Sequence, residues 1–341
     1  MSSSARLLFI LHPGALGDAL LASTAIHALK NRFPDHRLVW FGHKEVGKVF
    51  ASAQLVHQAY SFETLPVFSS EKSLEIKEGW LDILFNRCAR LVGWLADTDG
   101  LWQRWAEALG VSTYIFRSPH DPSLFQHHMA DRYSETLLPW QISPGAGEAK
   151  KETVSILNTV LRSSRKHGQT LVDRLEERVI ILHPGSGSRI KCASPELLAK
   201  VVRRMLIKPT SRLCLVGGPA DVEILQTMED VLGDLDLTIL KNLDLLTMSR
   251  HLTNAQLFIG HDSGLSHLAA CLGVPSLLLF GPTDPSIWAP RGEHVRVLRR
   301  ACHCCNREAM EQCFIRPCLA PHQDEVIQQA EFILSGVQAL V

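Results

Sequence analysis

The sequence predicts an α/β protein of two domains that face each other across a cleft. The chain has 341 residues, which is enough for two domains with well-buried cores. Short apolar runs alternate with helical patterns, and this order is typical of parallel sheets. The two halves also open in the same way: a buried strand, at residues 6–11 and again at 179–182, is followed by a turn that starts with His-Pro-Gly.

The composition is that of an ordinary globular protein, with 46% hydrophobic and 21% charged residues. The 35 basic residues are balanced by 35 acidic ones, which argues against a nucleic-acid partner bound by bulk charge. The apolar run at residues 7–11 is too short for a signal peptide, and no run approaches the ~18 residues of a membrane span. We therefore expect a cytoplasmic protein, and peripheral contact with a membrane stays open.

In the first half, the strand at 6–11 is followed by a turn at 12–18, a helix that begins at Ala19, and a second strand at 38–41. Asp18 follows Gly14 and Gly17 at the strand end that should face the cleft. Two roles are open for this carboxylate: it is a general base, or it caps the helix. A helix N-terminus favours an ionised carboxylate, and a base must be ionised to accept a proton.

In the second half, the turn at 183–188 lies between the strand at 179–182 and a helix that begins at Pro195. Its glycines let the backbone approach a ligand closely, and hydroxyl and ammonium groups are available for phosphate oxygens. Alone, a turn of this kind is weak evidence for a phosphate-binding site, because most such turns are only connecting loops. The candidate residues are Gly185, Ser186, Ser188 and Lys191.

The stretch from 257 to 284 predicts a strand at 257–260, a helix capped by Asp262 or Ser263 and ended by Gly273, and a second strand at 274–280. This unit presents a helix N-terminus, with its unpaired N–H groups, at the carboxyl edge of the sheet, where open α/β sheets bind ligands. Together with the turn at 183–188 it predicts a clamp on a nucleotide diphosphate; a purely structural turn is the alternative.

Five cysteines crowd residues 302–318. One reading is a tetrahedral zinc site; the other is a reduced, thiol-rich loop. The spacing from Cys313 to Cys318 is looser than in a usual zinc ribbon, so we predict no metal and no cofactor. The one candidate metal cluster is Cys302, Cys305, Cys313 and Cys318. The remaining cysteines (Cys88, Cys192, Cys214 and Cys271) are predicted to pack as small apolar residues.

Four motifs in order resemble the heptosyltransferases of glycosyltransferase family 9. They begin at His12 (HPGALGD), His183 (HPGSGS), Asp262 (DSGLSH) and Leu279 (LFGPTDP), so the resemblance covers nearly the whole chain. It implies a GT-B fold of two Rossmann-like domains: an acceptor-side domain at 1–165, a nucleotide-sugar domain at 175–325, and a C-terminal helix at 326–341 that packs back on the first domain.

The same resemblance implies an inverting, metal-independent transfer of heptose from ADP-heptose to the inner core of lipopolysaccharide. Asp18 matches the catalytic base, with Gly14 and Gly17 beside it on the acceptor side. Ser186 and Lys191 match diphosphate-contacting positions, although residues 192–195 depart from the usual pattern after the lysine. The donor-binding loop is matched by Asp262, Ser263, Gly264, Leu265 and His267.

Several alternatives stay open. Trp80, Trp94, Trp102 and Trp105 indicate either a membrane-facing amphipathic surface or core packing, and core packing is favoured. Asp221 or Glu223 contacts a ribose hydroxyl or caps a helix. A polar stretch at 163–169 is predicted to link the domains. At the level of function, the alternatives are a transferase or epimerase that uses another nucleotide sugar, and a non-catalytic protein that binds a nucleotide or lipid core.

Overall fold

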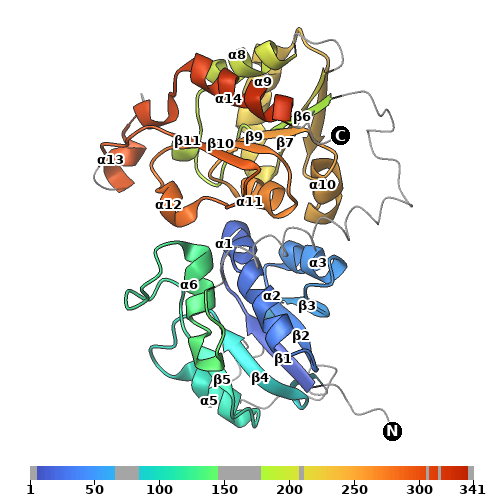
Figure 1. Cartoon of the computed structure of the whole chain (residues 1–341), viewed down its shortest axis with the longest axis vertical. Coiled ribbons are helices and arrows are strands. Elements are labelled where there is room, and N and C mark those ends of the chain that lie inside the picture. Colours follow the sequence, from blue (N-terminus) through green and yellow to red (C-terminus); the bar gives the residue numbers. More distant parts are fainter. Residues whose placement is uncertain are drawn as a thin grey trace. The chain divides into compact units, whose positions relative to one another are not determined.

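The computed structural model describes residues 6–65, 84–144, 178–206, 211–304, 307–313 and 316–336. The chain divides into two compact units, Met1–Val160 and Leu161–Val341 (Figure 1). The predicted linker at 163–169 and the predicted boundaries at 165 and 175 lie outside the described residues. The division at these positions therefore stays a prediction.

The first unit is built on a parallel sheet with the strand order β3-β2-β1-β4-β5. The central strand is buried on both faces, which explains why its sequence is a continuous apolar run and not an alternating one. The strands are β1 (Arg6–Leu11), β2 (His36–Gly42), β3 (Gln58–Ser61), β4 (Cys88–Gly93) and β5 (Tyr114–Phe116). The helices are α1 (Leu16–Leu21), α2 (Ser23–Arg32), α3 (Lys44–Ser52), α5 (Leu101–Ala108) and α6 (Met129–Glu135).

Three of the four tryptophans that the sequence analysis singled out are described by the structure, and they belong to the core of the first unit. Trp94, Trp102 and Trp105 are all buried, and the last two pack edge to face with ring centroids 5.9 Å apart. Core packing is thus confirmed for these three residues, and a membrane-facing surface made of them is wrong. Trp80 lies outside the described residues.

The second unit repeats the architecture with one more strand, in the order β11-β10-β9-β6-β7-β8. Every pair in this sheet is parallel. The strands are β6 (Arg178–Leu182), β7 (Ser211–Gly217), β8 (Leu237–Lys241), β9 (Leu257–His261), β10 (Ser276–Phe280) and β11 (Val295–Arg299). The longer helices are α8 (Pro195–Met205), α9 (Val222–Leu232), α10 (Leu245–Leu252), α11 (Gly264–Cys271) and α14 (Gln323–Gly336), and the short α12 (Pro285–Trp288) and α13 (Arg307–Glu311) lie between them.

The helix ends follow the local chemistry that the sequence predicts. Ser263, and not Asp262, caps α11: its hydroxyl accepts a hydrogen bond from the amide of Ser266. After this helix, Gly273 adopts a left-handed backbone conformation with φ of 71°, which glycine accepts without strain. Ser194 caps α8 in the same way as Ser263 caps α11.

The last helix, α14, begins at Gln323, three residues before the predicted start. It packs against α8 in the second unit and buries Val326 and Ala330 in that unit's core. Its predicted packing on the first unit stays a prediction, since residues 337–341 lie outside the described part. None of the described helices combines the length and the apolar character that a bilayer crossing needs.

In each sheet the direction in which successive strands are added reverses beside the strand that comes first in the chain; this position is the switch point of the sheet. In the first unit β1 lies between β2 and β4, and in the second unit β6 lies between β7 and β9, so the chain runs outward from each first strand in both directions. Doubly wound sheets bind ligands at the carboxyl ends of the strands at such a point. Ligand sites are therefore expected at the turns that follow β1, β6 and β9.

The core of the second unit gives a test of the fold. Leu213 of β7 is fully buried, so Leu213→Ala is expected to lower the free energy of unfolding by about 2–5 kcal/mol in urea denaturation. Val222→Ala, at a position that is 60% exposed, is the matched control and should change it by less than about 0.5 kcal/mol. Equal effects of the two substitutions would contradict the placement of β7.

Candidate functional site

The turn after β1 is organised around the buried imidazole of His12. The amide of Gly14 donates to Nδ1 of His12 at 3.2 Å, and Nε2 lies 2.9 Å from the hydroxyl of Tyr133. Because Nδ1 accepts a hydrogen bond, the ring proton is on Nε2 and points to Tyr133. Burial lowers the pKa of His12 to about 3, so the ring is neutral near pH 7.

Asp18 lies in the first turn of α1, beside this imidazole. The helix begins at Leu16, and Ala15 is its N-cap residue, so the alternative that Asp18 caps a helix beginning at Ala19 is wrong. The pKa of Tyr133 is raised by burial and further by the negative charge of Asp18. The turn also requires a glycine: a Cβ on Gly14 would lie 2.6 Å from His12 and 3.0 Å from the Cβ of Asp18.

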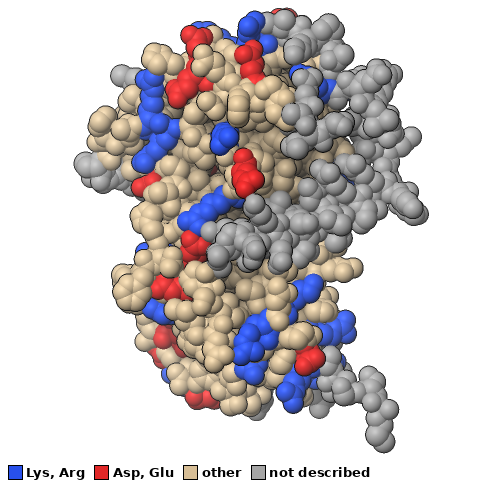
Figure 2. Space-filling view, in the orientation of Figure 1, with Lys and Arg blue, Asp and Glu red and all other residues tan. Residues whose placement is uncertain are grey.

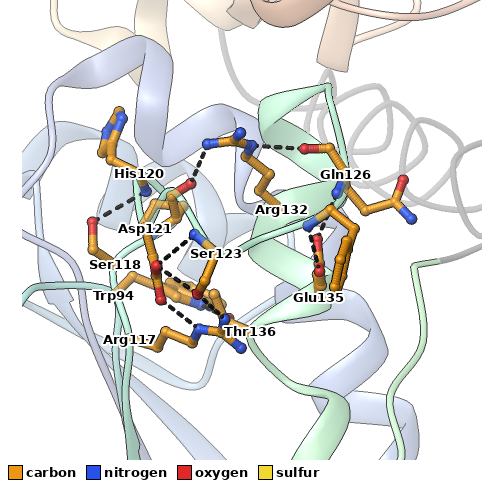
Figure 3. A network of polar contacts seen from close by, with 12 residues as sticks. Trp94, Arg117, Ser118, His120, Asp121, Ser123, Gln126, Arg132, Glu135 and Thr136 are labelled. Atoms are coloured by element: carbon orange, nitrogen blue, oxygen red, sulfur yellow. Dashed lines mark hydrogen bonds and ion pairs between the residues drawn. The ribbon is translucent and has the colours of Figure 1, made fainter.

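Helix α6, which carries Tyr133, is held by a network of polar contacts (Figure 3). The buried Glu135 accepts hydrogen bonds from the amides of Phe125 and Gln126, both at 2.8 Å. Arg132 donates to the carbonyl of Gln126 at 2.7 Å, and Trp94 donates to Thr136 at 2.9 Å. The network fixes the loop between β5 and α6, and through α6 it fixes the partner of His12.

In the second unit, the turns after β6, β9 and β10 meet at one point. The ammonium group of Lys191 lies 2.7 Å from Oδ2 of Asp262, and the hydroxyl of Thr283 donates to the same oxygen at 2.8 Å. The hydroxyl of Ser186 donates to the backbone carbonyl of Asp262 at 2.7 Å. Asp262 therefore orients a cation and a hydroxyl at the carboxyl edge of the sheet.

The other predicted donor-side residues lie around this point. Gly185 and Ser188 belong to the turn after β6, and Gly264 and Leu265 form the start of α11, where N–H groups lack intrahelical partners. His267 lies within α11 and is buried, and its predicted contact with the donor stays a prediction. The structure adds three residues to the predicted sites: Thr283 and His183 lie in motifs already named, whereas nothing in the sequence marks Tyr133.

Asp221 acts within the fold of this region. Its carboxylate accepts a hydrogen bond from the amide of Gly218 at 2.8 Å and lies 3.1 Å from Nε2 of His183. Of its two predicted roles, the hydrogen bond from Gly218 matches the helix cap, because Gly218 is the N-cap residue of the 3₁₀ helix Pro219–Asp221. Glu223 forms an ion pair with Arg189 at the surface, where both side chains are exposed.

A cavity of about 840 Å³ lies beside the turn after β6. Its size falls in the range of small-molecule sites. Its polar wall includes Ser186, Arg189, Asp221 and Arg316, and prolines and aliphatic residues line the remainder. The face of the molecule in Figure 2 shows basic and acidic side chains scattered over it, in line with the zero net charge.

The predicted cysteine cluster is only partly described. Cys318 is buried, and Cys302 and Cys313 are half-buried, while Cys305 lies outside the described residues. Within the described ranges no group of three or more His, Cys, Asp or Glu side chains is arranged to hold a metal ion. Of the scattered cysteines, Cys192 and Cys214 are buried as predicted, and Cys88 and Cys271 are half-buried.

Comparison with known proteins gives a consistent result. The family model for glycosyltransferase family 9 (heptosyltransferase) matches residues 93–318. The chain is 20% identical over 308 residues to lipopolysaccharide heptosyltransferase 3 of Escherichia coli, covering 82% of this chain and 83% of that protein. It is 22% identical to lipooligosaccharide heptosyltransferase 2 of Campylobacter jejuni, covering 96% and 98%.

Among solved structures, that of the E. coli heptosyltransferase WaaC with ADP has a TM-score of 0.67 at 15% identity, covering 96% of this chain and 99% of that one. This likeness concerns the fold. The predicted α/β class, with two Rossmann-like units of the GT-B type, is confirmed.

Two glycines of the turn after β6 give a matched test of the second site. A Cβ on Gly185 would lie 1.9 Å from Oδ1 of Asp221, whereas a Cβ on Gly187 would meet no atom within 4 Å. Gly185→Ala is therefore expected to lower the free energy of unfolding by about 1–3 kcal/mol, measured in urea. Gly187→Ala should change it by less than about 0.5 kcal/mol. A tolerated Gly185→Ala would contradict the packing of Asp221 on this turn.

Proposed function

Because the chain belongs to glycosyltransferase family 9, the heptosyltransferases, and is a glycosyl-transferring enzyme, we propose that it transfers heptose from ADP-heptose to the inner core of lipopolysaccharide. The observation that carries the proposal is the meeting of three motif turns at the switch point of the second sheet, where a cation, hydroxyls and a helix N-terminus gather. The names of two relatives and the ADP of a solved neighbour support the choice of acceptor and donor.

On the donor side, Lys191 and the N-terminus of α11 stabilise the diphosphate. Asp262 holds the ammonium group of Lys191 at this edge before a ligand arrives, so little reorganisation is needed on binding. The first amides of α11 add hydrogen-bond donors and the positive end of the helix dipole. The same groups act on the departing ADP, whose negative charge grows as the glycosidic bond breaks.

On the acceptor side, Asp18 is the general base. The reaction is an in-line displacement: the acceptor oxygen forms a bond to the anomeric carbon of heptose, and the bond from that carbon to the diphosphate oxygen breaks. The bonding electrons leave with ADP, and the acceptor proton moves to the Asp18 carboxylate. His12 and Tyr133 support this role, because their hydrogen bond fixes the turn that carries Asp18.

The proposal places the enzyme in the cytoplasm, in peripheral contact with the membrane that holds the lipid acceptor. One surface residue supports such contact: Phe125 is 94% exposed, and its amide is fixed by the buried Glu135. A large aromatic side chain held in water by a rigid loop is a suitable anchor for the interface of a bilayer.

Replacement of the proposed base tests the mechanism. We expect Asp18→Asn to lower turnover by about 100-fold or more, the scale of general-base catalysis, while the affinity for ADP changes less than about threefold. Asp35→Asn, on the exposed surface of the same unit, is the control and should retain full activity. Heptose transfer and ADP binding are measured on the same preparations. Full activity of Asp18→Asn would remove this residue from the chemistry.

Replacement of the proposed diphosphate contact tests the donor side. Lys191→Ala is expected to weaken ADP binding by roughly 10- to 100-fold in calorimetry, because it removes a charged hydrogen bond of about 1.5–3 kcal/mol. Adenosine binding should change little, since it has no phosphate. Lys200→Ala on the exposed face of α8 is the control. Equal losses for ADP and adenosine would contradict contact with the diphosphate.

The same assays separate the alternatives. A transferase or epimerase that uses another nucleotide sugar would bind UDP or GDP in preference to ADP, and an epimerase would turn over its substrate without an acceptor. A non-catalytic relative would bind a nucleotide and form no product.

A further inference from the structure

Arg316 lies on the wall of the cavity beside the turn after β6, although it comes from a segment outside the four motifs. It directly precedes the 3₁₀ helix Pro317–Leu319. Nη1 of Arg316 donates to the backbone carbonyl of Arg189 at 2.5 Å. The 3₁₀ turn Arg189–Lys191 therefore carries the proposed diphosphate contact, Lys191, and is also bonded to the guanidinium of Arg316.

The charge of Arg316 is not neutralised by this partner. Lys191 is paired with Asp262, and Arg189 forms a surface ion pair with Glu223. The partner of Arg316 is a carbonyl oxygen, which carries no net charge. The cavity wall as a whole stays balanced, because two carboxylate side chains line it together with two arginines. An anionic ligand can therefore contact Arg316 without breaking an ion pair between residues that the structure describes.

The thiol of Cys192, on the same wall, responds to all these cations. Burial and the charge of Asp221 raise its pKa to about 11. The positive charges of Arg316, Arg189 and Lys191 oppose that rise. The cations of the turn after β6 and of the segment at 316 thus act on one part of the cavity.

An arginine at position 316 is unfavourable for folding on two counts. Its backbone is left-handed, with φ of 44° and ψ of 58°, a conformation that glycine and asparagine adopt far more readily. Its Nε is buried and has no hydrogen-bond partner among the described residues. Strain of this kind is typical of residues whose side chains have a function.

The residues that follow Arg316 fix its position. Cys318 and Leu319 are buried in the core of the second unit, and the amide of Leu319 donates to the carbonyl of Arg316 at 2.9 Å. Leu319 packs on Gly281 of the motif that begins at Leu279, since a Cβ on this glycine would lie 2.6 Å from the leucine side chain. The guanidinium is therefore held at the cavity before a ligand arrives, which lowers the entropy lost on binding.

We propose that Arg316 is a donor-binding residue, whose guanidinium contacts the phosphate oxygens of the nucleoside diphosphate beside Lys191. The inference rests on the proposed function for the identity of the ligand. A guanidinium forms charge-assisted hydrogen bonds with phosphate oxygens. The cavity adjoins the proposed diphosphate site, because Ser186 lines the cavity and also donates to the carbonyl of Asp262.

Arg316→Asn separates ligand binding from folding. Asparagine tolerates the left-handed conformation, so the melting temperature should equal or exceed that of the native protein. ADP binding should weaken roughly tenfold in calorimetry, as expected for one charged hydrogen bond, and adenosine binding should not change. Arg250→Gln, at an exposed position of α10, is the control and should bind ADP like the native protein. Unchanged ADP affinity in Arg316→Asn, or an equal loss for adenosine, would overturn the proposal.

A second experiment distinguishes direct contact from a role in holding the turn of Lys191. With direct contact, Arg316→Asn should still weaken ADP binding severalfold when it is combined with Lys191→Ala. If Arg316 acted only by orienting Lys191, the double variant would bind ADP as Lys191→Ala does, and this outcome would also overturn the proposal. Arg316→Gln is measured in the same way if the asparagine variant does not fold.

The native protein provides the separate check on the proposed function. If it bound UDP or GDP in preference to ADP, the proposed donor would be wrong, and the contact of Arg316 would be measured with that nucleotide. A native protein that bound no nucleoside diphosphate would overturn both the proposed donor site and the role of Arg316. Normal ADP binding with no heptose transfer would count against the proposed function alone.

Discussion

A buried imidazole at the end of the first strand holds each of the two turns on which the sites depend. In the first unit His12 binds the Gly14 amide and the Tyr133 hydroxyl, and in the second unit His183 lies between Asp221 and Ser263. Both rings are removed from water, so each unmet hydrogen bond would cost about 1–3 kcal/mol. Because a change of conformation would break these hydrogen bonds, each turn is held in one conformation. In this conformation the two turns position Asp18 and the N-terminus of α11.

The two histidines show how one local motif serves two electrostatic environments. His12 stacks between Trp40 and Tyr133, with ring centroids 5.2 and 5.6 Å away, and its partners need only a neutral ring. His183 instead lies between a carboxylate and a hydroxyl, 3.1 Å from Asp221 and 3.2 Å from Ser263. The same three residues, His-Pro-Gly, therefore begin the turn of the proposed base in one unit and the turn of the proposed diphosphate site in the other.

Local features of the fold were predictable because they depend on neighbouring residues. The apolar runs predict the strands, and the caps of α8 and α11 follow from a serine directly before each helix. The start of α1 was placed three residues late, because Ala15 offers no side-chain cap to mark it. The partners of the histidines were not predictable: Tyr133 is 121 residues from His12, and Asp221 is 38 from His183. Such contacts arise only from the order of the strands.

The pairing of Lys191 with Asp262 has a consequence for how a ligand arrives. A cation that already faces a carboxylate at 2.7 Å projects little net field into the solvent, and the chain as a whole has no net charge. If the proposed donor site is right, a nucleotide sugar meets this surface by ordinary diffusion, and its association rate depends little on ionic strength. Differences in affinity between nucleotide sugars would then lie in their dissociation rates, after the diphosphate has displaced water and contacted the helix N-terminus.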